Sequence, residues 1–124
     1  MVTFDDDIDV LQASQLRALA SPTRLRIIHL LGSGSREVNE VSRALGIVQA
    51  TTSQHLAAMR AVGLVEPMRD GRTVRYRLVD PQILDACGLM RAVLVRRLSR
   101  LGEMAATATA ATESSTDTRQ AGHP

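Results

Sequence analysis

The fold is decided by residues 38–78, which read VNEVSRALGIVQATTSQHLAAMRAVGLVEPMRDGRTVRYRL. The stretch begins with two helical patterns, each ended by a glycine suited to a left-handed helix stop, Gly46 and Gly63. Their inward positions repeat every three to four residues: Val38, Val41 and Leu45, then Thr52, Leu56 and Met59. The period then changes to the alternation of strands on both sides of Asp70-Gly71, a strong hairpin signal. The sequence therefore predicts a helix, a turn, a second helix and a hairpin.

Further helices are predicted on both sides of this stretch. One runs from Asp7 to Ala20, and Ser21-Pro22 starts the next, because serine is a good N-cap and proline fits the first helical position. A last helix begins at Asp80-Pro81 and carries a long apolar stripe: Ile83, Leu84, Cys87, Met90, Leu94, Leu98 and Leu101. Small and polar residues dominate from Ala105 and predict disorder. We therefore expect an acidic arm at 1–10, one domain at 11–104 and a disordered tail at 105–124.

The composition limits the function. All 15 basic residues are arginines, and residues 11–104 carry 14 of them against seven acids, whereas residues 1–10 carry four aspartates. A basic central body favours a polyanionic partner. A single cysteine excludes an intrachain disulfide framework. Nothing resembles a phosphate loop, a nucleophile–base pair or a signal peptide, and no apolar run approaches the ~20 residues of a membrane helix. We expect a cytoplasmic protein that is not an enzyme and does not contact membranes.

Two helices joined by a tight glycine turn and followed by a hairpin describe a helix-turn-helix with a wing. The expected fold class is mainly α with a two-stranded β-wing. The second helix, starting near Gln49, presents small and polar side chains outward and can enter a DNA major groove about 12 Å wide. The hairpin adds exposed arginines beside it. The apolar stripe of the last helix is too continuous for a small monomer, which favours a homodimer with recognition helices roughly 34 Å apart on inverted half-sites.

Each outward residue receives a predicted role toward double-stranded DNA. Short polar side chains on the second helix would read base edges, and these are Thr51, Ser53 and Gln54. Residues at its start and flank, and on the return strand, would position phosphates: Gln49, His55 and Arg75. In the hairpin, Arg69 adds positive charge, and Arg72 at the tip would probe a narrow minor groove.

Three stretches together resemble the ArsR/SmtB family of bacterial winged-helix repressors. They are LRALASPTRLRIIHLL, NEVSRALGIVQATTSQHLAAMRAVGLVEP and RDGRTVRYRL, and the resemblance covers about residues 11–100. It implies a homodimer built from the first and last helices, and a palindromic operator whose occupation blocks transcription. In that family QATTSQHL would begin the recognition helix and RDGRTVRYRL would form the wing.

The family resemblance also implies metal sites, and this chain departs from both recurrent ones. Where the family has a Cys-Val-Cys-like stretch, this chain has Glu37-Val38-Asn39. On the last helix Asp80 matches, but Gln82 replaces a histidine, and Val93 and Arg96 stand where the second ligand pair would fall. A different inducer, a metal site elsewhere or constitutive binding remain open. No cofactor is assigned, and a divalent ion such as Ni²⁺, Zn²⁺ or Co²⁺ on Asp5, Asp7 and His29 is the weaker alternative.

His29 and Cys87 can each be interpreted as structural residues as well as functional ones. His29 lies in a mostly apolar helix, which favours a core or half-buried histidine over a metal ligand. Cys87 is in register with apolar neighbours and is expected to be a small buried hydrophobe, with a thiol switch as the alternative. The competing function from another class is a winged-helix module that binds a partner protein.

Overall fold

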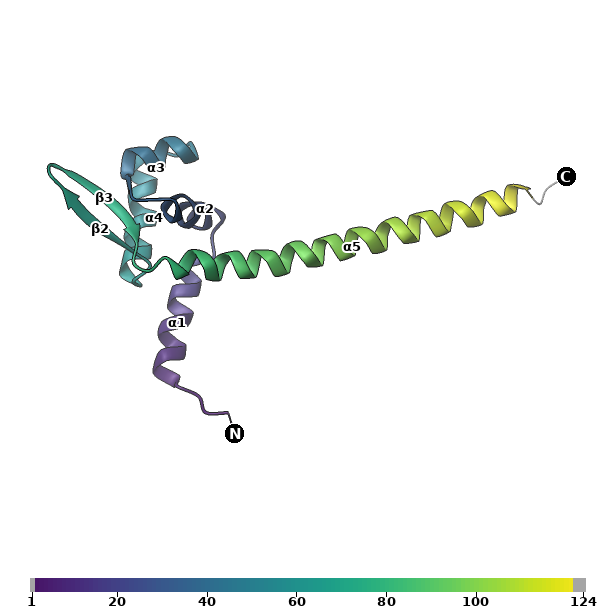
Figure 1. Cartoon of the computed structure of the whole chain (residues 1–124), viewed down its shortest axis with the longest axis horizontal. Coiled ribbons are helices and arrows are strands. Elements are labelled where there is room, and N and C mark those ends of the chain that lie inside the picture. Colours follow the sequence, from purple (N-terminus) through teal and green to yellow (C-terminus); the bar gives the residue numbers. More distant parts are fainter. Residues whose placement is uncertain (1, 122–124) are drawn as a thin grey trace. The chain divides into compact units, whose positions relative to one another are not determined.

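The computed structural model describes the backbone of residues 2–121 and the side chains of residues 2–113. Its contacts divide the chain into two units, Met1–Cys87 and Gly88–Pro124. Eight elements follow one another along the chain (Figure 1): α1 (Asp6–Leu19), α2 (Pro22–Gly32), β1 (Arg36–Glu37), α3 (Val38–Leu45), α4 (Gln49–Ala61), β2 (Val65–Asp70), β3 (Thr73–Leu78) and α5 (Gln82–Ala121). The predicted order of helix, helix, helix, helix, hairpin and helix is confirmed.

The helices begin and end where local chemistry favours it. The Asp5 carboxylate accepts a hydrogen bond from the Ile8 backbone N–H at 3.1 Å, and the Ser21 hydroxyl caps α2 ahead of Pro22. At the start of α3 the Glu40 carboxylate accepts from the Glu37 backbone N–H. These contacts satisfy backbone donors that have no partner inside their helix. Asp6, Asp7 and Asp9 of the acidic stretch at 1–10 lie in the first turn of α1, where carboxylates also complement the helix dipole.

The sheet has three strands in the order β1-β3-β2, all antiparallel. β2 and β3 form the predicted hairpin, turning at Gly71, whose φ of 63° is readily adopted only by glycine. β1 adds two residues against β3, pairing Arg36 with Tyr76 and Glu37 with Arg75. The sequence pattern predicts only the two strands of the hairpin. A two-residue strand has no periodicity of its own, so its pairing arises only from tertiary contact.

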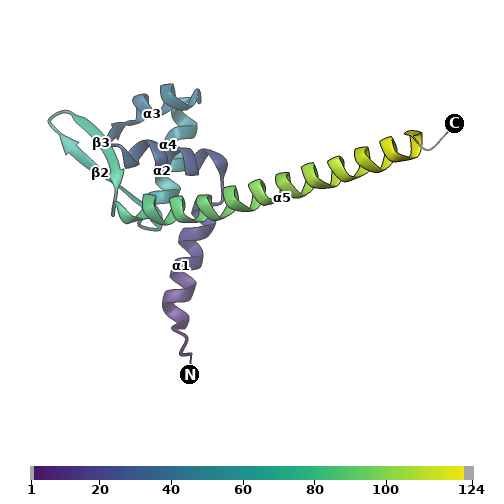
Figure 2. The ribbon, with the colours of Figure 1, turned by 45° about the vertical axis from the view of Figure 1, so that its right-hand side comes forward.

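The core of the first unit lies between α2, α3, α4 and the base of the sheet. The two ribbon views show these elements lying together (Figures 1 and 2). Its fully buried residues include Ile27, Ile28, Val41, Leu56 and Met59. The first turns of α5 close this core with three half-buried side chains, Ile83, Leu84 and Cys87. Gly32 ends α2 directly against Leu84, and a Cβ there would overlap the leucine side chain. Burial of one face of each helix thus holds α4 and the hairpin in place.

The second unit consists of α5 beyond Gly88, which remains helical to Ala121. This differs from the predicted tail at 105–124, of which residues 122–124 lie outside the described residues. Alanine has the highest helix propensity, and AATATAAT continues a helix already begun. Along this part of α5, large apolar side chains are exposed in the single chain, including Met90, Leu94 and Leu98. No helix among the described residues is long and apolar enough to cross a membrane.

Candidate nucleic-acid interface

The two helices of the turn, α3 and α4, are joined by a buried hydrogen bond. The Ser42 hydroxyl donates to Thr52 Oγ1 at 2.8 Å, and Thr52 in turn donates to the Val48 carbonyl. Thr52, Leu56 and Met59 are fully buried, as predicted for the inner face of α4. This contact joins the two helices at the buried face of α4 and leaves the opposite face outward.

Removing the hydroxyl of Thr52 should cost more stability than removing the hydroxyl of Ser42, although both changes break the same hydrogen bond. Thr52→Val leaves the Ser42 donor buried without its partner, and we expect unfolding to become easier by about 1–3 kcal/mol. Ser42→Ala should cost less, because the Thr52 hydroxyl keeps its bond to Val48. Urea unfolding of both variants and of the double variant checks this. Equal costs for the two single changes would contradict it.

The outer face of α4 carries the predicted base-reading residues. Ser53 and Gln54 are exposed, and Thr51 is half-buried beside the buried Thr52. Gln49 is exposed in the first turn, where backbone N–H groups also face outward. The side chains on this face are short and the alanines between them are small, so the helix backbone can approach a base edge closely.

His55 is held by a residue that the sequence analysis did not single out. Arg24 in α2 donates its Nε–H to His55 Nδ1 at 3.0 Å and a second N–H to the Ala18 carbonyl at 3.1 Å. Because Nδ1 accepts, the proton of the neutral ring lies on Nε2, the nitrogen left to donate elsewhere. Arg24 thereby links α1, α2 and α4 and orients the ring. No sequence signal pairs two residues 31 positions apart.

Arg75, predicted to position a phosphate, is engaged within the chain. Its guanidinium donates to Ser35 Oγ at 3.0 Å and to the Ser35 carbonyl at 2.7 Å, and it forms ion pairs with Glu40 at 3.3 Å and Glu37 at 3.7 Å. These contacts fasten β3 to the start of α3. Arg77 is likewise paired, with Glu66 at 2.8 Å. Two of the arginines of the hairpin are thus neutralised by acids of the same chain.

The remaining hairpin arginines are unpaired. Arg69 near the end of β2 and Arg72 at the tip are exposed, and within the described part of the chain neither guanidinium group forms a hydrogen bond or an ion pair. Asp70 lies at the tip as well, yet its carbonyl, not its carboxylate, is the group bonded there, to the Thr73 hydroxyl. The uncompensated positive charge of the hairpin therefore lies at Arg69 and Arg72.

The predicted metal ligands are not brought together. Asp5 caps α1 and Asp7 lies exposed in its first turn. His29 is exposed on α2, so the expectation of a core or half-buried histidine was wrong: the side of α2 that packs inward is that of Ile27, Ile28 and Leu31. Among the described residues, no three His, Cys, Asp or Glu side chains lie close enough together to hold a metal ion.

Cys87 is half-buried against the core, and burial raises the pKa of its thiol. A raised pKa lowers the thiolate fraction at neutral pH, and the thiolate is the reactive form. We expect the folded protein to react with iodoacetamide at pH 7.5 at least several-fold more slowly than the same chain in urea. Mass spectrometry of timed samples measures both rates. A faster reaction in the folded state would instead support the alternative that Cys87 acts as a thiol switch.

A polar recognition face on α4, flanked by a hairpin with free arginines, defines a winged helix-turn-helix DNA-binding protein. Comparison with known proteins gives its family. The family described as "Bacterial regulatory protein, arsR family" matches residues 21–66. The chain is also 37% identical over 90 residues to the uncharacterized HTH-type transcriptional regulator Rv0081 of Mycobacterium tuberculosis, covering 72% of this chain and 79% of the relative. The chain belongs to the arsR family of transcriptional regulators.

Solved structures agree with this assignment. The homodimeric winged helix-turn-helix DNA-binding domain of Mb0332 from Mycobacterium bovis, described as a possible ArsR-family regulator, superposes with a TM-score of 0.71 at 30% identity, covering 81% of this chain and 95% of that one. The crystal structure of Rv0081 gives 0.68 at 34% identity, with 75% and 94% covered. The regulator CmtR of Mycobacterium bovis is 40% identical over 79 residues, 63% of this chain and 67% of the relative.

Proposed function

We propose that this protein is a repressor that binds inverted-repeat operator DNA as a homodimer. The observation that carries the proposal is the exposed polar face of α4 beside a hairpin whose tip arginines have no acid partner among the described residues. Gln54, Ser53 and Thr51 read base edges, and Gln49 and His55 contact phosphates. Arg72 enters the minor groove next to the half-site, where narrow A·T tracts attract arginine.

The dimer is supported by apolar surface in both units. In the first unit a groove of about 690 Å³ lies between α1 and the end of α4, with Ile8, Leu11 and Val62 in its lining. In the second unit Met90 is 70% exposed and Leu98 57% exposed in the single chain. Surface of this kind is normally covered by a partner. The Mb0332 domain is described as homodimeric. Sedimentation equilibrium should give about twice the 13.4 kDa of one chain.

Direct titration of DNA tests the function. Fluorescence anisotropy with a duplex from the region upstream of its own gene, and with a scrambled duplex, gives the affinity and the specificity ratio. The logarithm of the binding constant should fall steeply with the logarithm of salt, by about 0.9 for each phosphate neutralised. Binding that ignores salt, or that does not distinguish the two duplexes, would contradict a sequence-specific repressor.

The same titration addresses the inducer. With both recurrent metal positions altered, at Glu37-Val38-Asn39 and Gln82, we propose that the effector is not a metal held at those positions. Titrations without metal and with Ni²⁺, Zn²⁺ or Co²⁺ should agree within a factor of two. A tenfold shift, or about 1.4 kcal/mol of coupling, would instead favour an Asp and His site elsewhere.

A further inference from the structure

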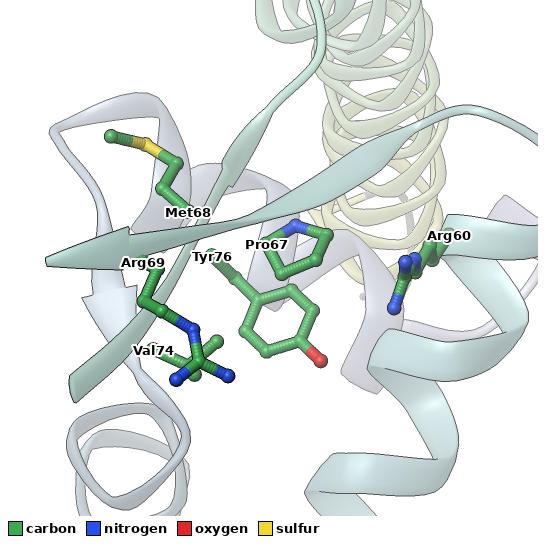
Figure 3. A pocket seen from close by; sticks show the side chains of 6 residues that line it. All are labelled: Arg60, Pro67, Met68, Arg69, Val74 and Tyr76. Carbon is green, nitrogen blue, oxygen red and sulfur yellow. The ribbon is translucent and has the colours of Figure 1, made fainter. Parts of the chain in front are cut away.

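A hollow lies between the last turn of α4 and one face of the hairpin. Its volume is about 370 Å³, and it is lined by Arg60, Pro67, Met68, Arg69, Val74 and Tyr76. Figure 3 shows Arg60 on one side, Arg69 on the other, and the Tyr76 ring between them under Pro67. The base-reading residues proposed above lie on the earlier turns of α4 and do not line this hollow.

The hairpin side of the hollow is built from two cross-strand pairs. Pro67 lies opposite Tyr76, and Arg69 lies opposite Val74, so all four residues share one face of the hairpin. Arg75 and Arg77, at alternate positions of β3, are the arginines already paired with Glu40 and Glu66. The alternation of the strand thus separates a neutralised face from a face with free positive charge.

The helix side is continuous with the DNA-reading face. Ser53, Ala57 and Arg60 are spaced by four and three residues, which places them in one row along α4, and all three are exposed. Arg60 therefore extends the row that begins at a proposed base reader. A recognition helix in the major groove, with the wing tip in the adjacent minor groove, has one sugar–phosphate strand between them, because that strand separates the two grooves.

The chemistry of the hollow matches that strand. Its polar groups are two guanidinium groups and one phenol hydroxyl, with no carboxylate in the lining. Among the described residues, none of these three groups has a hydrogen-bond or ion-pair partner in the chain. Arginine presents a planar fork of donors suited to phosphate oxygens. Pro67 and Val74 supply an apolar wall of the kind a deoxyribose can pack against.

We propose that Arg60, Arg69 and Tyr76 clamp one phosphodiester, and its adjoining deoxyribose, of the DNA strand that separates the two grooves. This inference rests on the proposed DNA binding and adds a backbone site at the opposite end of α4 from Gln49. Such a site fixes how far the recognition helix slides along the groove, since phosphate contacts set register and base contacts set sequence.

Single substitutions separate the parts of the clamp. Because the dimer carries two copies of Arg60, Arg60→Ala should reduce the salt slope by about 1.8, or 0.9 for each copy, whereas Arg60→Lys should keep the slope because the charge remains. Tyr76→Phe removes only the hydroxyl and should weaken binding about tenfold with the slope unchanged. Arg100→Ala removes an exposed arginine of the second unit and should change neither quantity. Circular dichroism and sedimentation of each variant establish that it folds and assembles as the parent does.

Modified DNA locates the contact. Duplexes that carry one neutral methylphosphonate, moved along the strand, should reveal one position at which the parent loses affinity and Arg60→Ala loses no more. Calorimetry with inorganic phosphate alone tests the other source of the same chemistry. Phosphate binding that Arg60→Ala abolishes, with DNA slopes equal for parent and variant, would assign the hollow to a free anion and overturn the proposal.

The failure of the clamp differs from the failure of the function. If the parent binds its operator with a steep salt dependence, but Arg60→Ala keeps the full slope and the same methylphosphonate profile, the clamp is wrong and the DNA-binding function stands. If the parent binds no duplex at low salt, the proposed function and the proposed clamp are both wrong.

Discussion

Leu56→Ala is expected to lower the free energy of unfolding by about 2–5 kcal/mol, which is a large share of the stability of a small domain. Leu56 is fully buried on the inner face of α4, where it joins the core formed by Ile27, Ile28 and Met59. Removing its branched side chain forfeits its transfer free energy and leaves a cavity between helices held in fixed positions. Urea unfolding followed by circular dichroism, at one protein concentration for all variants, measures the change.

The matched control for Leu56→Ala is the same exchange at Leu25 on α2, which is 40% exposed. Since about 25 cal/mol is lost per Å² of apolar surface no longer buried, Leu25→Ala should cost less than half as much. A smaller loss at Leu56 than at Leu25 would show that the inner face of α4 is not the centre of the core. The residues that we propose to read DNA would then lack the rigid support of a packed helix.

The elements of this fold are readable from sequence because each has a local cause. Glycines with positive φ at 46, 63 and 71 end or turn the chain where the sequence analysis placed these features. The side chains of Asp5 and Ser21 each cap a helix by accepting a hydrogen bond from a backbone N–H three residues further along, and Pro22 lies in the first turn of α2. The buried positions of α4 follow its 3.6-residue period. Local propensity, hydrophobic pattern and turn chemistry agree here, which is the condition under which sequence specifies structure.

The partners of the charged side chains could not be predicted in this way. Arg75 and Arg69 are both arginines of the hairpin strands. Arg75 forms an ion pair with Glu40, 35 positions away, whereas Arg69 forms none with an acid among the described residues. Which of these arginines is paired with an acid depends on the pairing of β1 with β3, a two-residue contact without its own sequence pattern. His55 depends in the same way on Arg24. The exposure of His29 and the continuation of α5 past Ala105 also lay outside what periodicity predicts.

Combining Gln54→Ala with Arg72→Ala is expected to abolish measurable operator binding at physiological salt. A glutamine that contacts an adenine through both its acceptor and its donor contributes about 1–3 kcal/mol of discrimination, and an arginine in a narrow minor groove adds an electrostatic contribution. Gln54 lies on α4 and Arg72 at the hairpin tip, and both side chains are exposed without a hydrogen bond or ion pair among the described residues. Their losses should therefore add, with unfolding unchanged.

The two single variants separate sequence-specific base contact from electrostatic attraction to DNA. Gln54→Ala should lower affinity for the operator about 5- to 150-fold for each of the two half-sites and leave binding to scrambled DNA nearly unchanged, because a base contact carries sequence information. Arg72→Ala should weaken both and, since the dimer carries two copies of Arg72, reduce the salt slope by about 1.8. Gln82→Ala, an exposed glutamine at the start of α5, is the matched control and should change neither. A double variant that still binds its operator as the parent does would show that these two residues do not carry the contact. A parent that binds no duplex at low salt, but holds a partner protein that the double variant also holds, would favour the competing function, a winged-helix module whose partner is a protein.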